Sequence, residues 1–258
     1  MRLLWYFPMS KKISLLVLLL ALGNPTLRAE ELTIAVASNF TGAMDALISR
    51  FETSSGHEVK VSYGSSGRLY AQIINGAPFE LFFSADQAKP QRLEQAGHVV
   101  PDSRFTYATG ALVLWSATPG IALTQGESLQ TQAISRLAIA NPRLAPYGFA
   151  AMQVLQALDL EDVYGDRLVM GENINQAFQF VNTGNAQAGF VALAQVSENG
   201  IIQRGSGWII PDNLYAPIRQ DVVLLKKGAG NQAALEFLEF IESDEAKALI
   251  KSYGYSTD

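Results

Sequence analysis

Short apolar runs that are typical of β-strands alternate with helical patterns along most of this chain. The strand-like runs lie at residues 32–36, 59–63, 81–83, 111–115, 137–140, 168–170, 189–192 and 221–225. The stretches with apolar residues at helical spacing lie at residues 43–51, 69–74, around Leu93, 149–158, 177–181 and 233–253. Strands that alternate with helices in this way indicate an α/β protein with largely parallel strands.

At two places near the start of this pattern, a strand-like run passes through small polar residues directly into a helix. The first junction is at Ser38 and Asn39, and the second is Gly-Ser-Ser-Gly at residues 64–67. The first turn of a helix exposes unpaired N–H groups and carries partial positive charge, which favours anion binding. The pattern therefore predicts the capture of an oxyanion rather than catalysis.

Two later junctions repeat this arrangement. Residues 141–148 lead from a strand-like run into a helix and include Pro146, a residue type that suits the first helical turn. Residues 171–174 form the fourth junction. Ligands of open α/β sheets bind beyond the carboxyl ends of the strands, so we expect the four junctions to line one cleft.

The order of the elements predicts two lobes. The first lobe is expected to contain residues 30–110 and 219–258, and the second lobe residues 111–218. Each lobe then has about 100 residues, enough for a core of its own. Two strands would cross between the lobes, near Ala111 and near Arg219, and act as a hinge.

The first 29 residues are typical of an export signal. A basic stretch ends in Lys11 and Lys12, an apolar segment covers residues 13–22, and Ala29 is a small residue at the expected cleavage point. The apolar segment is too short to remain as a membrane-spanning helix. We therefore expect this segment to be removed and the remaining chain to lie outside the cytoplasm.

Cysteine content and charge narrow the function further. The chain contains no cysteine, so a lipid anchor at the cleavage point, disulfides and thiolate metal sites are not expected. Its formal net charge is −5, and loss of the basic residues of the signal makes it more negative, which disfavours nucleic-acid binding. The sequence thus predicts a freely diffusing periplasmic protein.

Four segments form an ordered set. They are Ala-Val-Ala-Ser-Asn-Phe at 35–40, Gly-Ser-Ser-Gly at 64–67, Gly-Ala-Pro-Phe-Glu-Leu-Phe-Phe-Ser-Ala-Asp at 76–86 and Tyr-Gly-Tyr at 253–255. Together they resemble the periplasmic molybdate-binding proteins of ABC importers, the ModA family. The resemblance implies the type II periplasmic binding protein fold, an α/β fold with two lobes. Each lobe is a mostly parallel sheet flanked by helices, and two crossover strands join the lobes.

The resemblance also implies a function. Proteins of this family bind a molybdate or tungstate oxyanion between the lobes and deliver it to a membrane permease that a cytoplasmic ATPase drives. For this chain it implies a periplasmic monomer that is not an enzyme, has no catalytic residues and needs no cofactor beside its ligand.

The resemblance assigns the binding residues one by one. Ser38 and Ser66 would supply hydroxyl and amide donors from the first lobe, with Asn39 as an adjacent donor. The backbone N–H groups of Tyr147 and Ile174 would come from the second lobe. Molybdenum would be held only as the oxyanion, with no direct metal ligands among these residues.

Two positions depart from the family pattern. Some members carry in the second lobe a Tyr whose hydroxyl reaches the anion, and the matching residue here is Ala192, which has no side-chain donor. Arg68 stands where the family more often has a small polar residue. These departures leave open the number of donors and the role of Arg68.

A site made of donors alone suits a fully deprotonated dianion. Phosphate carries protons near neutral pH, and a ligand proton without an acceptor costs about 1 to 3 kcal/mol. Sulfate is also unprotonated, so its exclusion would depend on the size of the cavity. The nearest alternative is therefore a binding protein of the same fold for another oxyanion, or for an organic acid held by Arg68.

Two further classes are disfavoured. A hydrolytic enzyme would need a nucleophile elbow, and residues 64–67 lack the Gly-x-Ser-x-Gly spacing. The two histidines, His57 and His98, lie beside glycines in loop-like stretches, where we expect them to be solvated. The ligand-sensing half of a transcription regulator shares the architecture but needs a DNA-binding segment where this chain has an export signal.

Overall fold

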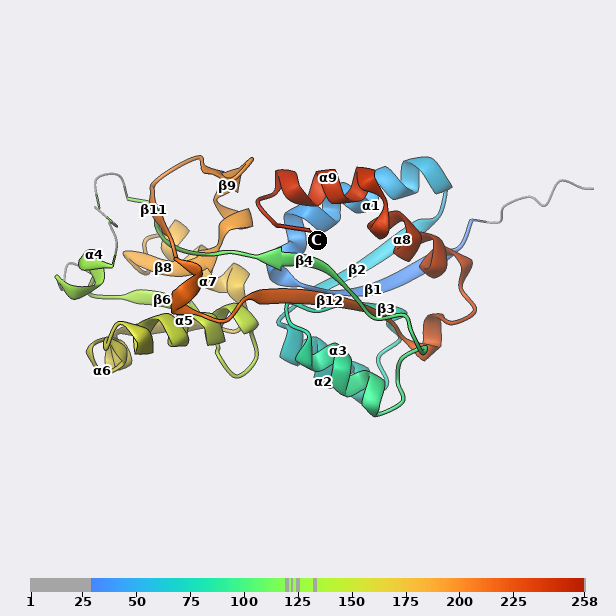
Figure 1. The fold of residues 1–258 in the computed structure, drawn as a ribbon, viewed down its shortest axis with the longest axis horizontal. Helices are drawn as coiled ribbons and strands as arrows, with labels where there is room; N and C mark the ends of the chain where they lie inside the picture. The colour runs from blue at the N-terminus through green and yellow to red at the C-terminus, as the bar shows by residue number, and fades with distance from the viewer. Residues whose placement is uncertain (1–28, 119–120, 122, 124–125, 132–133, 258) are drawn as a thin grey trace, which may run out of the picture.

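Two five-stranded sheets, each flanked by helices, lie side by side in an elongated molecule (Figure 1). The computed structural model describes residues 29–118, 121, 123, 126–131 and 134–257. The predicted export signal, except for Ala29, lies outside the described residues. Among the described residues, none of the helices combines the length and the apolarity that a membrane crossing requires.

The first sheet has the strand order β2-β1-β3-β12-β4. Its strands are β1 (Glu31–Ala37), β2 (Glu58–Gly64), β3 (Leu81–Phe83), β4 (Phe105–Gly110) and β12 (Ile218–Leu224). Strand β1 is parallel to β2 and β3, whereas β12 is antiparallel to both of its neighbours. The parallel strands β1 and β2 therefore end at the same edge, where their polar junctions follow.

Helices cover both faces of this sheet (Figure 1). One face is covered by α1 (Thr41–Ser55), α8 (Gln232–Glu242) and α9 (Asp244–Ser252), and the other by α2 (Ser66–Ile74) and α3 (Ala88–Gln95). Ile34 and Val36 of β1 pack into the first layer, and Ala35 between them packs into the second. Because both faces are buried, residues 34–37 of the strand are an unbroken apolar run.

The second sheet has the strand order β11-β5-β8-β6-β7. Its strands are β5 (Leu112–Ser116), β6 (Leu137–Ala140), β7 (Leu168–Gly171), β8 (Ala188–Ala192) and β11 (Ser206–Ile209). The helices of this half are α4 (Glu127–Gln130), α5 (Pro146–Ala157), α6 (Glu161–Tyr164) and α7 (Ile174–Asn182). Strand β6 is parallel to β7 and β8. The fully buried side chains of Trp115 and Phe190 belong to the hydrophobic core around this second sheet.

We call the first sheet with its helices the first lobe, and the second sheet with its helices the second lobe. The chain passes from β4 through Ala111 into β5, and it returns between β11 and β12. Gly110 pairs with Ile218, so the two crossing strands are neighbours. The residue boundaries predicted for the lobes remain a prediction.

Short elements complete the chain. They are the 3₁₀ helices η1 (Ser38–Phe40), η2 (Gly165–Arg167), η3 (Leu193–Gln195), η4 (Asp212–Leu214) and η5 (Lys226–Gly228), and the strand pair β9 (Ser197–Glu198) and β10 (Ile201–Ile202). The single helical stretch predicted for residues 233–253 is wrong in detail. The hydroxyl of Ser243 accepts the N–H of Ala246 and caps a new helix, so α8 and α9 are separate.

Candidate functional site

The five residues predicted to bind the anion all line one small cavity between the two lobes. The lining residues are Ala37, Ser38, Asn39, Gly64, Ser65, Ser66, Ala85, Ala145, Pro146, Tyr147 and Ile174. About 10 Å³ of the cavity is open to the centre of a water-sized sphere, which is near the minimum for one water molecule. The structure therefore brings the four junctions together around one small cavity.

The first junction places Ser38 and Asn39 where strand β1 ends. The 3₁₀ helix η1 begins at Ser38 and leads directly into α1, so the first N–H groups of η1 have no acceptor within that helix. The hydroxyl of Thr41 donates to the carbonyl of Ser38 at 2.8 Å and fixes this turn. The junction thus presents main-chain donors and the Ser38 side chain at the cavity.

Ser66 is the first residue of α2, immediately after the end of β2. Its hydroxyl oxygen accepts the backbone N–H of Ala85 at 2.9 Å. A hydroxyl has one proton to donate beside the lone pairs with which it accepts. The bond from Ala85 therefore orients the Ser66 oxygen and leaves its proton available for a ligand.

The second lobe contributes the first turns of α5 and α7. Tyr147 follows Pro146, which has no N–H, at the start of α5. Ile174 is the first residue of α7, and the side chain of Asn173 accepts the N–H of Gln176, three residues after it. The N–H groups of Tyr147 and Ile174 belong to the helical first turns, which have no acceptor within the helix.

A glycine lets α5 begin directly against the end of β6. A Cβ atom at Gly148 would lie 2.1 Å from the carbonyl oxygen of Ala140, the last residue of that strand. No larger residue fits this contact without a shift of the backbone. The close approach of α5 to β6 therefore fixes the position of the first turn of α5. The N–H of Tyr147 belongs to that turn.

The side chain of Asn39 is held behind the cavity. Its amide nitrogen donates to the side-chain oxygen of Gln220 at 2.8 Å and to the hydroxyl of Tyr255 at 3.2 Å. The Tyr255 hydroxyl donates back to the carbonyl of Asn39 at 2.7 Å. Both amide protons are engaged in this arrangement, which leaves the backbone N–H as the donor that Asn39 offers.

These bonds belong to a buried polar network that reaches both lobes. Gln220, on the crossing strand β12, is 0% exposed, and it also accepts the hydroxyl of Tyr107 at 3.1 Å. Its amide nitrogen donates to the hydroxyl of Tyr147, from the second lobe, at 3.5 Å. Burial raises the pKa of Tyr107, Tyr147 and Tyr255, so the three phenols stay neutral at ordinary pH.

No charged side chain is found among the eleven described residues that line the cavity. Arg68, the nearest candidate from the sequence, instead donates to the carboxylate of Glu172 in the second lobe at 2.8 Å. Their side chains are 56% and 38% exposed, so the pair lies at the surface of the cleft. Within the described part of the chain, no cluster of three or more histidine, cysteine or acidic residues offers a metal site.

The lobes also touch through their backbones beside the cavity. The N–H of Gly67 donates to the carbonyl of Leu144 at 2.8 Å. A Cβ atom at Gly67 would lie 2.9 Å from that oxygen and 3.0 Å from the Cα atom of Leu144. The amide of Asn175 donates to the hydroxyl of Thr41 at 3.2 Å. The lobes are therefore in contact, as they are in a closed cleft.

Ala192 lies at the end of β8, fully buried and paired with Leu112. It is not one of the cavity's lining residues, and its N–H donates to the side chain of Gln195 at 3.0 Å. The alanine has no side-chain donor at this position, where the resemblance implies a tyrosine in some family members. Ser65, by contrast, lines the cavity although the sequence reasoning did not select it.

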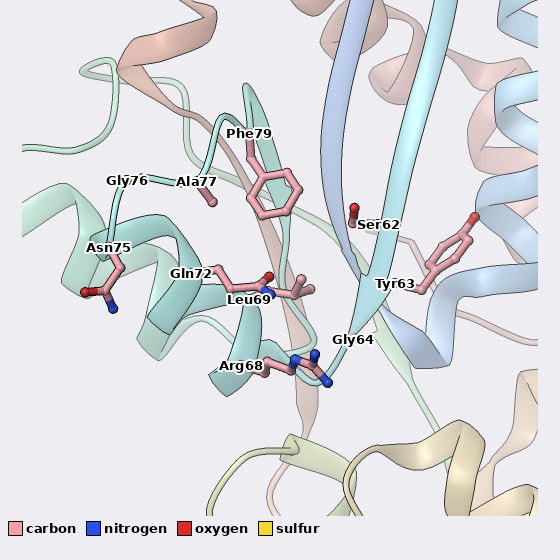
Figure 2. Close-up of a pocket in the computed structure, with 10 residues that line it drawn as sticks. All are labelled: Ser62, Tyr63, Gly64, Arg68, Leu69, Gln72, Asn75, Gly76, Ala77 and Phe79. Carbon is pink, nitrogen blue, oxygen red and sulfur yellow. The ribbon is translucent and has the colours of Figure 1, made fainter.

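A larger cavity of about 730 Å³ lies on the first lobe, between β2 and α2 (Figure 2). Three of its polar side chains, those of Tyr63, Arg68 and Asn75, already make hydrogen bonds within the protein. Figure 2 shows the ring of Tyr63 pointing away from α2, and its hydroxyl donates to Asp45. Asn75 donates to the carbonyl of Ala71 in its own helix, and Arg68 bonds Glu172. This groove is far larger than a small oxyanion and is lined from the first lobe alone, so it suits that ligand less well than the cavity between the lobes does.

Comparison with known proteins places these features in a family. The sequence pattern of the family described as "Bacterial extracellular solute-binding protein" matches residues 32–256. A relative named "Molybdate-binding protein ModA" from Azotobacter vinelandii is 49% identical over 249 residues, which cover 96% of this chain and 99% of the relative. A protein of the same name from Rhodobacter capsulatus is 44% identical, with 94% of each chain covered.

A solved structure agrees with the sequence relatives. The Azotobacter vinelandii periplasmic molybdate-binding protein superposes with a TM-score of 0.85 at 43% identity, covering 88% of this chain and 99% of that chain. This match confirms the predicted two-lobe α/β fold, and the relatives are solute-binding proteins rather than enzymes. The chain therefore belongs to the bacterial extracellular solute-binding protein family, among its ModA members.

Proposed function

We propose that the protein captures molybdate, or the closely similar tungstate, in the cavity between its lobes. The observation that carries the proposal is the cavity itself, which is lined by helix first turns and serine residues and, among the described residues, by no charged side chain. The family membership adds support, because relatives that share nearly half of the sequence carry the name molybdate-binding protein.

Donors of this kind can replace the water shell of a dianion. Each hydrogen bond to a charged oxygen contributes about 1.5 to 3 kcal/mol net. Ser38, Asn39, Ser66, Tyr147 and Ile174 together offer at least five such bonds. About −8 kcal/mol corresponds to micromolar binding, so this set is sufficient for submicromolar affinity after the cost of closing the cleft.

We further propose that the protein works in the periplasm, as a monomer, and passes its ligand to the membrane permease of an ABC importer with a cytoplasmic ATPase. The support is the resemblance of residues 35–40, 64–67, 76–86 and 253–255 to such proteins. Closure on the anion brings the two lobes into one fixed arrangement, which a permease can distinguish from the open form.

Titration calorimetry with four anions tests the proposed ligand. Molybdate and tungstate are expected to bind with submicromolar dissociation constants. Phosphate should bind at least about 10-fold more weakly, because its proton finds no carboxylate in the cavity. Sulfate should also be weaker, because its shorter bonds to oxygen would let it reach fewer of the donors that surround a molybdate ion. Sulfate or phosphate binding as tightly as molybdate would contradict the proposal.

The Arg68→Ala variant separates this proposal from an organic-acid site. Because Arg68 pairs with Glu172 at the exposed edge of the cleft, we expect molybdate affinity to fall by no more than about 5-fold. The loss should shrink in high salt, which screens surface ion pairs. Calorimetry at low and high salt measures both effects, and Glu172→Gln is the matched control. Complete loss of binding in Arg68→Ala alone would favour an organic acid held by the guanidinium.

A further inference from the structure

Ser65 has a buried hydroxyl without a partner. The residue is 2% exposed, and its Oγ atom makes no hydrogen bond to any of the described residues. A buried hydroxyl left unpaired costs about 1 to 3 kcal/mol, so such atoms are uncommon in folded proteins. None of the described residues supplies the hydrogen-bond partner that this hydroxyl lacks.

Helix capping does not account for this hydroxyl. Ser65 is the N-cap residue of α2, but its side chain accepts no N–H from the helix. Three other N-cap residues of the chain do make that bond: Asn173 accepts from Gln176, Asn231 from Ala233, and Ser243 from Ala246. Ser65 therefore occupies a capping position without performing the usual capping role.

The position of Ser65 indicates where its partner belongs. The residue lines the cavity between the lobes, next to Ser66. The Ser66 oxygen is already oriented by the N–H of Ala85, whereas none of the described residues bonds the Ser65 oxygen. Because the Ser65 side chain is buried, lines this cavity and has no partner among the described residues, its hydroxyl is free to bond a ligand that fills the cavity.

We propose that the Ser65 hydroxyl donates a hydrogen bond to an oxygen of the bound anion and is a third serine donor beside Ser38 and Ser66. This assignment rests on the proposed function, because it needs a tetrahedral oxyanion in the cavity. The bond forms only in the complex, so it stabilises the bound state and not the ligand-free protein.

The Ser65→Ala variant tests the assignment, with Ser128→Ala as the matched control. Ser128 is also a buried serine whose hydroxyl lacks a partner among the described residues, but it lies on α4, and it is not one of the cavity's lining residues. We expect Ser65→Ala to weaken molybdate binding by about 10- to 100-fold in calorimetry. Ser128→Ala should bind as the wild type does. Neither change should lower the melting temperature of the ligand-free protein.

Each outcome decides the question. Wild-type affinity in Ser65→Ala overturns the assignment while leaving the proposed function intact. Weaker binding together with a lower melting temperature of the ligand-free variant also overturns it, since the hydroxyl would then support the fold. If the wild-type protein binds none of molybdate, tungstate, sulfate and phosphate, the proposed function fails and the assignment fails with it.

Discussion

Replacing Gly67 by alanine is expected to lower molybdate affinity by at least about 100-fold while both lobes stay folded. The new Cβ atom would lie 2.9 Å from the carbonyl oxygen of Leu144 across the cleft, too close for the lobes to keep their contact. A cleft that cannot close loses the donors of Tyr147 and Ile174. Two charge-assisted hydrogen bonds together contribute about 3 to 6 kcal/mol to the binding free energy. Because each loss of about 1.4 kcal/mol lowers the affinity tenfold, the expected loss is at least about 100-fold.

Calorimetry measures this loss, and small-angle X-ray scattering with molybdate present should give a larger radius of gyration for the variant than for the wild type. Gly165→Ala is the matched control, because none of the described atoms lies within 4 Å of the added Cβ and the residue has ordinary helical φ. Wild-type affinity in Gly67→Ala would mean that contact between residues 67 and 144 is not needed for binding.

Removing the hydroxyls of Ser38 and Ser66 together is expected to weaken molybdate binding by about 2 to 6 kcal/mol. The single variants Ser38→Ala and Ser66→Ala should each lose about half of that amount. Ser66→Ala also leaves the N–H of Ala85 without its acceptor, which should lower the free energy of unfolding by about 1 kcal/mol. Calorimetry and urea unfolding separate the two effects.

Ser54→Ala is the control for this double variant. The Ser54 hydroxyl donates to the carbonyl of Phe51 within α1, and the residue is not one of those lining the cavity. Its replacement should leave affinity unchanged. If the double variant kept the affinity of the wild type, the anion would have to bind outside the cavity between the lobes.

The meeting of the four strand-to-helix junctions at one site could be predicted, because each junction is determined by neighbouring residues of the sequence. A strand that ends in Ser or Asn and turns at once into a helix leaves a recognisable sequence at each of the four sites. The carboxyl ends of parallel strands then share one edge of a sheet, so β1 and β2 bring Ser38 and Ser66 to the same place. No knowledge of distant contacts is needed for this step.

Contacts between distant residues could not be predicted in the same way. The side chain of Asn39 is fixed by Gln220 and Tyr255, which are 181 and 216 residues further along the chain. Arg68 finds Glu172 only when the two lobes meet. Neither partner has a sequence signature, so the direction of the Asn39 amide and the pairing of Arg68 came only from the structure.

The local sequence pattern also led to a wrong prediction of the solvent exposure of one histidine. His57, expected to be solvated beside Gly56, is 4% exposed. Its ring stacks on Phe51 with centroids 5.9 Å apart, accepts the N–H of Glu30 and contacts the carboxylate of Glu236. The glycine marks the end of α1 correctly, but the residue after it is covered by α8, an element from the far end of the chain.

The ion pair between Arg68 and Glu172 has a practical consequence. The two positions are exposed, face each other from different lobes and lie in a chain whose native sequence has no thiol. Cysteines introduced at these two sites would therefore be the only ones available for labelling. With a dye on one cysteine and a quencher on the other, fluorescence would fall when the lobes meet. The labelled protein would then report the binding of its anion.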